Sequence, residues 1–148
     1  MSEHIKGQLE KMNQQVKELA AIYHGVASKS GISDNEFWVW YAMLALEGEH
    51  SQQDICETLS MPKQTVNSII SNLAKKGFVY QESVPGTRNR KIIRLSEEGK
   101  CFGESVVMRI YCAEQRALDR LSGEERSACI SLLGKYISQL KEELYEEE

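Results

Sequence analysis

The apolar residues near the start of the chain recur at alternating intervals of four and three positions. They are Ile5, Leu9, Met12, Val16, Leu19, Tyr23 and Val26. An average interval of 3.5 residues is the narrow seam of helices that wind around one another, because a straight helix of 3.6 residues per turn drifts away from such a repeat. The segment therefore predicts a long helix whose partner is another long helix, in the same chain or in a second copy.

Residues that interrupt helices are rare in the rest of the chain. Two prolines and ten glycines in 148 residues favour long helices over a many-stranded sandwich. Serines that cap helices, glycines that end them and the apolar spacing predict helices over about 34–47, from 51 to 59, over 63–76, over 96–120 and after 122. Capping boxes are expected at Ser33–Glu36 and Ser122–Glu125, and Pro62 is expected in a first helical turn. The helix over 34–47 is apolar nearly all round, which predicts the core helix.

Two short segments read as strands. Residues 78–83 and about 91–95 flank Val84-Pro85-Gly86-Thr87, a sequence with proline and glycine at the positions that a tight turn prefers. The chain is thus predicted to be one mainly α domain with a small β-hairpin. No apolar run reaches the roughly 18 residues that a bilayer requires, and the first residues lack the order of a signal peptide, so a cytoplasmic location is expected.

Charge is distributed unevenly along the chain. The formal net charge is −4, yet residues 51–96 carry seven basic and three acidic side chains. Within this basic segment, the helix over 63–76 places Val66, Ile69, Ile70 and Leu73 on one stripe and only amide, hydroxyl and ammonium groups elsewhere. Such side chains hydrogen-bond base edges and phosphates, and a basic hairpin follows with Arg88, Arg90, Lys91 and Arg94. A solvated basic surface is the alternative.

The cysteines and histidines form no recognised local motif. Cys56, Cys101, Cys112 and Cys129 are at least eleven residues apart, and His4, His24 and His50 lack metal-ligand spacing. No metal and no cofactor are expected, and the thiols are interpreted mainly as small apolar residues. An enzyme is not expected either, because no nucleophile motif, glycine-rich loop or pair of acids accompanies a histidine.

The order of these elements is that of a winged helix-turn-helix, in which the second helix enters the major groove of DNA. The chain resembles transcriptional regulators of the MarR family over nearly its whole length. The resemblance rests on SDNEFWVWYAMLAL, SQQDICETLSM, KQTVNSIISNLAKKGFVY and RNRKIIRLSEEGK, of which TVNSIISNLAKKGFV is the most specific. It implies a winged lobe over residues 33–96 and helical dimerisation regions over 1–32 and 97–148. A homodimer, often a repressor in this family, would then read a pseudo-palindromic operator in double-stranded DNA.

The resemblance also implies which residues face DNA. On the second helix of the motif and the segment after it they are Lys63, Gln64, Thr65, Asn67, Ser68, Asn72, Lys75, Arg88, Asn89 and Arg90. The amides suit adenine, the lysines suit phosphate, and Arg88 or Arg90 suits the minor groove. The family commonly has an aspartate that orients the arginine of the wing, whereas this sequence has Thr87-Arg88-Asn89, and Ser68 stands where many relatives have arginine.

Family members are often released from DNA by small anionic or phenolic effectors bound between the dimerisation helices and the lobe. The residues expected to line such a pocket are His24, Trp38, Tyr41 and Arg109. Three other interpretations remain open: a thiol redox switch through Cys101 or Cys112, a thiol enzyme, and a winged-helix module that binds protein instead of DNA. The sequence identifies neither the operator nor the effector.

Overall fold

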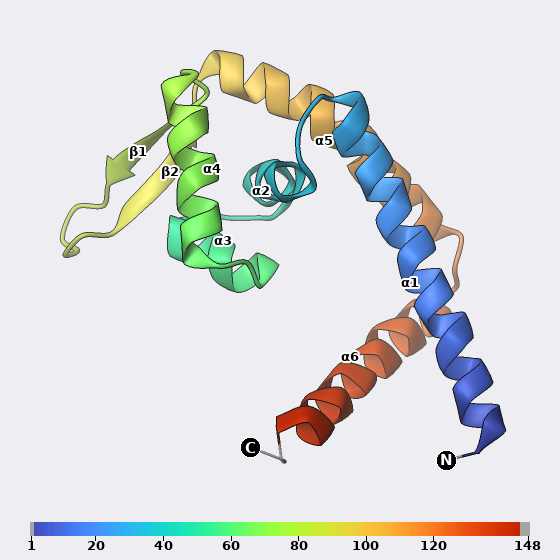
Figure 1. Ribbon diagram of the computed structural model, residues 1–148. Helices are drawn as coiled ribbons and strands as arrows, with labels where there is room; N and C mark the ends of the chain where they lie inside the picture. The colour runs from blue at the N-terminus through green and yellow to red at the C-terminus, as the bar shows by residue number, and fades with distance from the viewer. Residues whose placement is uncertain (1, 146–148) are drawn as a thin grey trace. The chain divides into compact units, whose positions relative to one another are not determined.

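The computed structural model describes residues 2–145 and divides the chain into two compact units, residues 1–110 and 111–148 (Figure 1). The elements follow one another as α1 (Glu3–Lys29), α2 (Asp34–Ala45), α3 (Gln52–Leu59), α4 (Lys63–Lys75), β1 (Val79–Ser83), β2 (Lys91–Leu95), α5 (Glu97–Asp119) and α6 (Gly123–Tyr145). The mainly helical class with one hairpin is confirmed. No helix within residues 2–145 is both long and apolar enough to span a bilayer.

Capping side chains set the starts of the helices much as expected. The Ser33 hydroxyl accepts from the Glu36 amide (3.1 Å), but the Glu36 carboxylate accepts from the Trp40 indole (3.2 Å), so the reciprocal half of this predicted capping box is replaced by a bond within α2. Pro62 is the N-cap of α4 and precedes its first turn, which corrects the predicted placement by one position. The last helix was also expected to fray into an acidic tail, Glu146 to Glu148, and these three residues lie outside those that the structure describes.

The capping box at the start of α6 is complete. Ser122 Oγ accepts from the Glu125 amide (3.1 Å), and Glu125 Oε1 accepts from the Ser122 amide (2.8 Å). The bond from the Ser122 amide, and after it the Ser122 side chain, hold the pKa of the Glu125 carboxyl group below its ordinary value.

Acidification is therefore expected to weaken α6. Because the folded-state pKa of Glu125 is depressed, its contribution to stability is present above the unfolded pKa of about 4.3 and disappears as the pH falls through the folded pKa. Glu125→Gln should unfold at a lower temperature than the native chain at pH 7 and approach the native melting temperature near pH 2–3. Glu124→Gln, one residue earlier, serves as the control, and a pH-independent difference for Glu125→Gln would contradict the assignment.

The core of residues 1–110 is built around α2. Phe37, Val39 and Trp40 are fully buried, as the apolar sequence of this helix predicted. Figure 1 shows α2 almost end-on between α4 and α5. Helices α3 and α4 pack on it through buried side chains, and the main ones are Ile55, Val66, Ile70 and Leu73. Ser60 links α3 to α4 in a left-handed conformation (φ 51°), which turns the chain sharply enough to form a helix-turn-helix.

The hairpin is antiparallel and pairs Val79 with Leu95 at its base and Ser83 with Lys91 at the end next to the loop. Val79, Ile92 and Ile93 anchor it to the core, and the Ile93 amide donates to the carbonyl of His50 (2.8 Å). Strand β1 begins at Val79, one residue later than predicted. The hairpin extends to one side beyond α4 in Figure 1 and forms the wing.

Two glycines of α5 were not expected to lie in the core. Gly99 and Gly103 are buried, and a Cβ at Gly99 would collide with the carbonyl of Phe78. At Gly103 a Cβ would lie 2.5 Å from Leu44 Cδ1 and 2.7 Å from a ring carbon of Trp40. Residues 97–110 therefore reach the core only because these positions carry no side chain. The buried face of α5 also includes Val106 and Val107.

Candidate nucleic-acid interface

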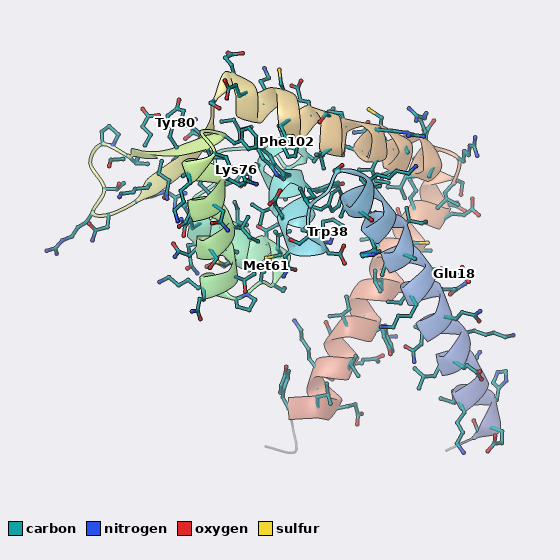
Figure 2. The ribbon with its side chains drawn as sticks, turned by 45° about the horizontal axis from the view of Figure 1, so that its top comes forward. Glu18, Trp38, Met61, Lys76, Tyr80 and Phe102 are labelled. Atoms are coloured by element: carbon teal, nitrogen blue, oxygen red, sulfur yellow. The ribbon has the colours of Figure 1, made fainter. Side chains whose placement is uncertain are left out.

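The exposed surface of α4 contains no acidic side chain. The amphipathic pattern buries its apolar stripe, so the polar residues are turned outward: Lys63, Gln64, Asn67, Ser68, Ser71, Asn72 and Lys75 are exposed, and Thr65 is half-buried. Figure 2 labels Met61 near the beginning of this helix and Lys76 at its end. Amide donors and acceptors thus alternate with hydroxyls along the helix, between a lysine in its first turn and another in its last.

An open groove of about 440 Å³ lies beside the beginning of α4. It is lined on one side by Gln64, Thr65 and Ser68 of α4 and on the other by Ser33 and Asn35 of α2. These groups are polar and uncharged. The groove therefore offers hydrogen bonds next to the face of α4 without repelling an anion.

A second groove, of about 340 Å³, separates the start of α3 from the wing. Its lining includes Arg88, Asn89 and Arg90, the three wing residues predicted as DNA contacts, and Lys91 of the basic hairpin. It also includes three amides that the sequence did not single out: Gln52, Gln53 and Gln81. Asn89 adopts a left-handed conformation (φ 68°), as does Gly86 (φ 79°), so the loop turns back at both ends around Arg88.

The cationic side chains of the wing are of two kinds. Arg94 donates to Glu49 Oε1 (2.8 Å) and Glu82 Oε2 (3.1 Å), and these acceptors, Glu49 first, hold its pKa above its ordinary value. Arg90 donates to Asp54 Oδ2 (3.0 Å). Arg88 and Lys91 are exposed, and no carboxylate of residues 2–145 forms an ion pair with either. The positive charge offered to an anion is therefore concentrated at Arg88 and Lys91.

The ion pairs of Arg90 and Arg94 were not predicted from the sequence, because Asp54 and Glu49 lie 36 and 45 positions away along the chain. In the register of the hairpin, Arg94 lies opposite Tyr80, two positions from Glu82. Knowledge of this register would have indicated the ion pair between Arg94 and Glu82.

The four residues predicted to hold an effector have different surroundings. Trp38 and Tyr41 are in edge contact (5.3 Å between ring centroids) within an aromatic cluster that also includes Tyr23 and Phe37. His24 Nδ1 lies 2.8 Å from Asp34 Oδ1, and Arg109 is exposed on α5. None of the four lines either groove described above.

The thiols also lie apart from these grooves. Cys56 is buried, Cys112 is half-buried, and Cys101 and Cys129 are exposed; all four are free thiols. Within residues 2–145 no three histidine, cysteine or acidic side chains gather in a way that would hold a metal ion.

A helix-turn-helix with a polar second helix and a β-hairpin immediately after it defines the winged helix-turn-helix class. A sequence model described as the MarR family matches residues 30–88. An uncharacterised HTH-type transcriptional regulator of Bacillus subtilis, YfiV, is 23% identical over 145 residues, covering 89% of this chain and 91% of the relative.

Solved structures agree over a greater length. NMB1585, a MarR family regulator from Neisseria meningitidis, superposes with a TM-score of 0.79 at 20% identity, covering 95% of this chain and 99% of that one. MepR of S. aureus, in a complex with DNA, gives a TM-score of 0.65 at 22% identity and covers 88% and 96% of the two chains. The resemblance to the MarR family is thereby confirmed: the MarR family model matches residues 30–88, and the fold agrees with that of a MarR family regulator over nearly the whole chain.

Proposed function

We propose that this protein is a transcriptional regulator that binds a pseudo-palindromic operator in double-stranded DNA as a homodimer. The observation that carries the proposal is the acid-free exposed face of α4, together with the cationic tip of the wing that follows it in the chain. A helix of this composition fits the major groove, where amides recognise bases and lysines contact phosphates. MepR, which shares the fold, is known in complex with DNA.

The roles of individual residues follow from their chemistry. Gln64, Asn67 and Asn72 each present an amide whose oxygen can accept from N6–H of adenine and whose NH2 group can donate to N7. Lys63 and Lys75 suit phosphates at the two ends of α4. Thr65 and Ser68 supply hydroxyls beside them. Arg88 is the wing residue proposed to enter the minor groove, since a narrow A·T-rich groove attracts an unpaired guanidinium.

The proposal of a homodimer rests on apolar surface that the single chain leaves uncovered. On α1, the seam residues from Ile5 to Leu19 are between 39% and 59% exposed, and no residue of α6 is buried. Its large apolar side chains recur at intervals of three and four: Ile130, Leu133, Ile137, Leu140 and Leu144. Contiguous apolar surface on this scale indicates an interface. We propose that residues 1–32 and 97–148 form the interface and that 33–96 form the DNA-binding lobe.

We propose repression as the sense of regulation, through a dimer that covers a promoter and blocks transcription. A reporter driven by the operator should then rise in expression when the gene for this protein is deleted. A fall in expression would indicate an activator. No feature of the described residues favours a particular effector, and release by a ligand would require different affinities for two dimer shapes.

The direct test is DNA binding by Asn67→Ala. Removal of an amide that recognises a base should weaken binding to the specific operator by about 1–3 kcal/mol, roughly 5- to 150-fold, and leave binding to scrambled DNA unchanged. Fluorescence anisotropy with both DNAs measures the difference. Gln14→Ala, at an exposed amide of α1 on the side away from the seam, is the matched control.

A parallel test separates the wing from the helix. Arg88→Ala should weaken binding to both DNAs, because phosphate and groove-potential contacts carry little sequence information. If neither DNA is bound even at low salt, the protein is not a DNA reader, and a winged-helix module that binds a protein partner becomes the better interpretation.

A further inference from the structure

One carboxylate oxygen joins the start of α3 to the wing. Asp54 Oδ2 accepts from the Ser51 amide (2.9 Å) and also from Arg90 Nη2 (3.0 Å). In return, the Asp54 amide donates to Ser51 Oγ (3.1 Å), which completes a capping box. Ser51 is only 7% exposed, so the carboxylate is hydrogen-bonded to a buried residue.

Arg90 is also the residue that closes the wing loop. Its carbonyl accepts from the amide of Val84 (2.9 Å), just beyond the last strand pair, Ser83 with Lys91. The residues between these anchors, 85–89, project from the hairpin with Arg88 among them. The segment 84–90 contains no acidic residue, so no carboxylate within the loop can orient its arginines.

We infer that Asp54 is a positioning residue for DNA binding, which fixes the wing through Arg90 so that Arg88 is presented in one orientation. The inference rests on the proposed function, because it requires that Arg88 binds DNA. An arginine that is already oriented loses less conformational freedom on binding, and the affinity is correspondingly higher. Asp54 thereby replaces an aspartate within the wing, and Arg90 becomes an anchor of the loop in place of a groove contact.

The sign of the effect on affinity distinguishes positioning from simple electrostatics. A carboxylate beside a DNA surface repels phosphates. If Asp54 had no positioning role, the native protein would therefore bind DNA more weakly than a variant with a neutral residue at this position. A positioning aspartate predicts the opposite: Asp54→Asn loses the ion pair with Arg90 and binds DNA less tightly, although the chain has gained positive charge. Asparagine retains an oxygen that can accept from the Ser51 amide, so the cap on α3 is preserved.

The experiment compares Asp54→Asn and Arg90→Gln with Glu57→Gln, which removes the same charge from the same helix at an exposed side chain whose partner is Gln53. The first measurement is the rate at which trypsin cleaves the native, DNA-free protein after Arg88. Loss of about 1 kcal/mol of anchoring should raise this rate roughly fivefold in Asp54→Asn and in Arg90→Gln, and leave it unchanged in Glu57→Gln. Arg90→Gln keeps the capping box intact, so it tests the anchor even if Asp54→Asn unfolds. Arg90→Lys, which retains a cation opposite Asp54, should restore part of the protection.

The second measurement is operator affinity. Asp54→Asn should raise the Kd for the operator about three- to tenfold. Arg88→Ala should reduce operator affinity less in the Asp54→Asn protein than in the native one, because Asp54 acts on DNA binding through Arg88. Unchanged cleavage after Arg88, together with tighter DNA binding by Asp54→Asn as by Glu57→Gln, would overturn the positioning role and leave the proposed function standing. A native protein that binds no DNA would overturn the proposed function itself, whatever the protease shows.

Discussion

Leu19→Asp is expected to convert the proposed dimer into monomers. Leu19 lies on the seam of α1 and is 55% exposed in the single chain, so an interface must cover it if the seam is used. Placing a carboxylate there leaves an unpaired charge in an apolar contact, which costs several kcal/mol. Sedimentation equilibrium at micromolar concentration should report a mass near 16.8 kDa for the variant and twice that value for the native chain. Operator affinity should fall by at least about tenfold, because a monomer engages one half-site instead of two.

Gln14→Asp is the matched control for this substitution. Gln14 is exposed on the same helix, about half a turn away from the seam, and gains the same charge without entering the proposed interface. It should remain dimeric and bind the operator as the native chain does. A native protein that is monomeric at micromolar concentration, or a Leu19→Asp variant that stays dimeric, would contradict the interface proposed for α1.

Gly99→Ala is expected to destabilise the core of residues 1–110 strongly, although it adds only one methyl group. The added Cβ meets the backbone carbonyl of Phe78, which cannot move away as a side-chain tip can. That carbonyl also accepts from the Ser96 amide (3.0 Å), while Ser96 Oγ donates to the Gly77 carbonyl (2.6 Å), so the junction is held from both sides. We expect a loss of about 2–3 kcal/mol in the free energy of unfolding, measured by urea denaturation.

Gly7→Ala provides the comparison of opposite sign. Gly7 is also helical, but no atom outside its own helix lies within 4 Å of the position a Cβ would take. The substitution should raise stability by up to about 1 kcal/mol through helix propensity alone. Equal destabilisation by both substitutions would show that the close approach of α5 to Phe78 is not what requires glycine at position 99.

The elements that local chemistry determines could be predicted from the sequence. Helix starts follow from Ser33, Ser51 and Ser122, whose hydroxyls accept amides three residues later, and β2 follows from an apolar pair next to a turn. The buried stripe of α4 follows from the spacing of its apolar residues, and its outward polar face follows from the same spacing. These signals lie within a few residues of one another, so no knowledge of the tertiary structure is needed.

The features that the sequence did not predict depend on contacts between distant segments. The requirement for Gly99 and Gly103 arises only where α5 passes close to Phe78 and Trp40, and glycine within a helix otherwise reads as a weakness. The same reason hides the wing anchor, because Asp54 looks like an ordinary capping residue until the hairpin brings Arg90 to it. The wing consequently carries fewer open cations than its sequence suggests.

The central claim is that α4 and the wing together bind a specific DNA sequence. The most direct measurement is an anisotropy titration of the purified protein against DNA from upstream of its own gene, across a salt series and with a scrambled competitor. The account predicts specific binding whose affinity falls steeply with salt, with a slope that becomes shallower by about one when Arg88 is replaced by alanine. Absence of binding to either DNA at low salt would contradict it.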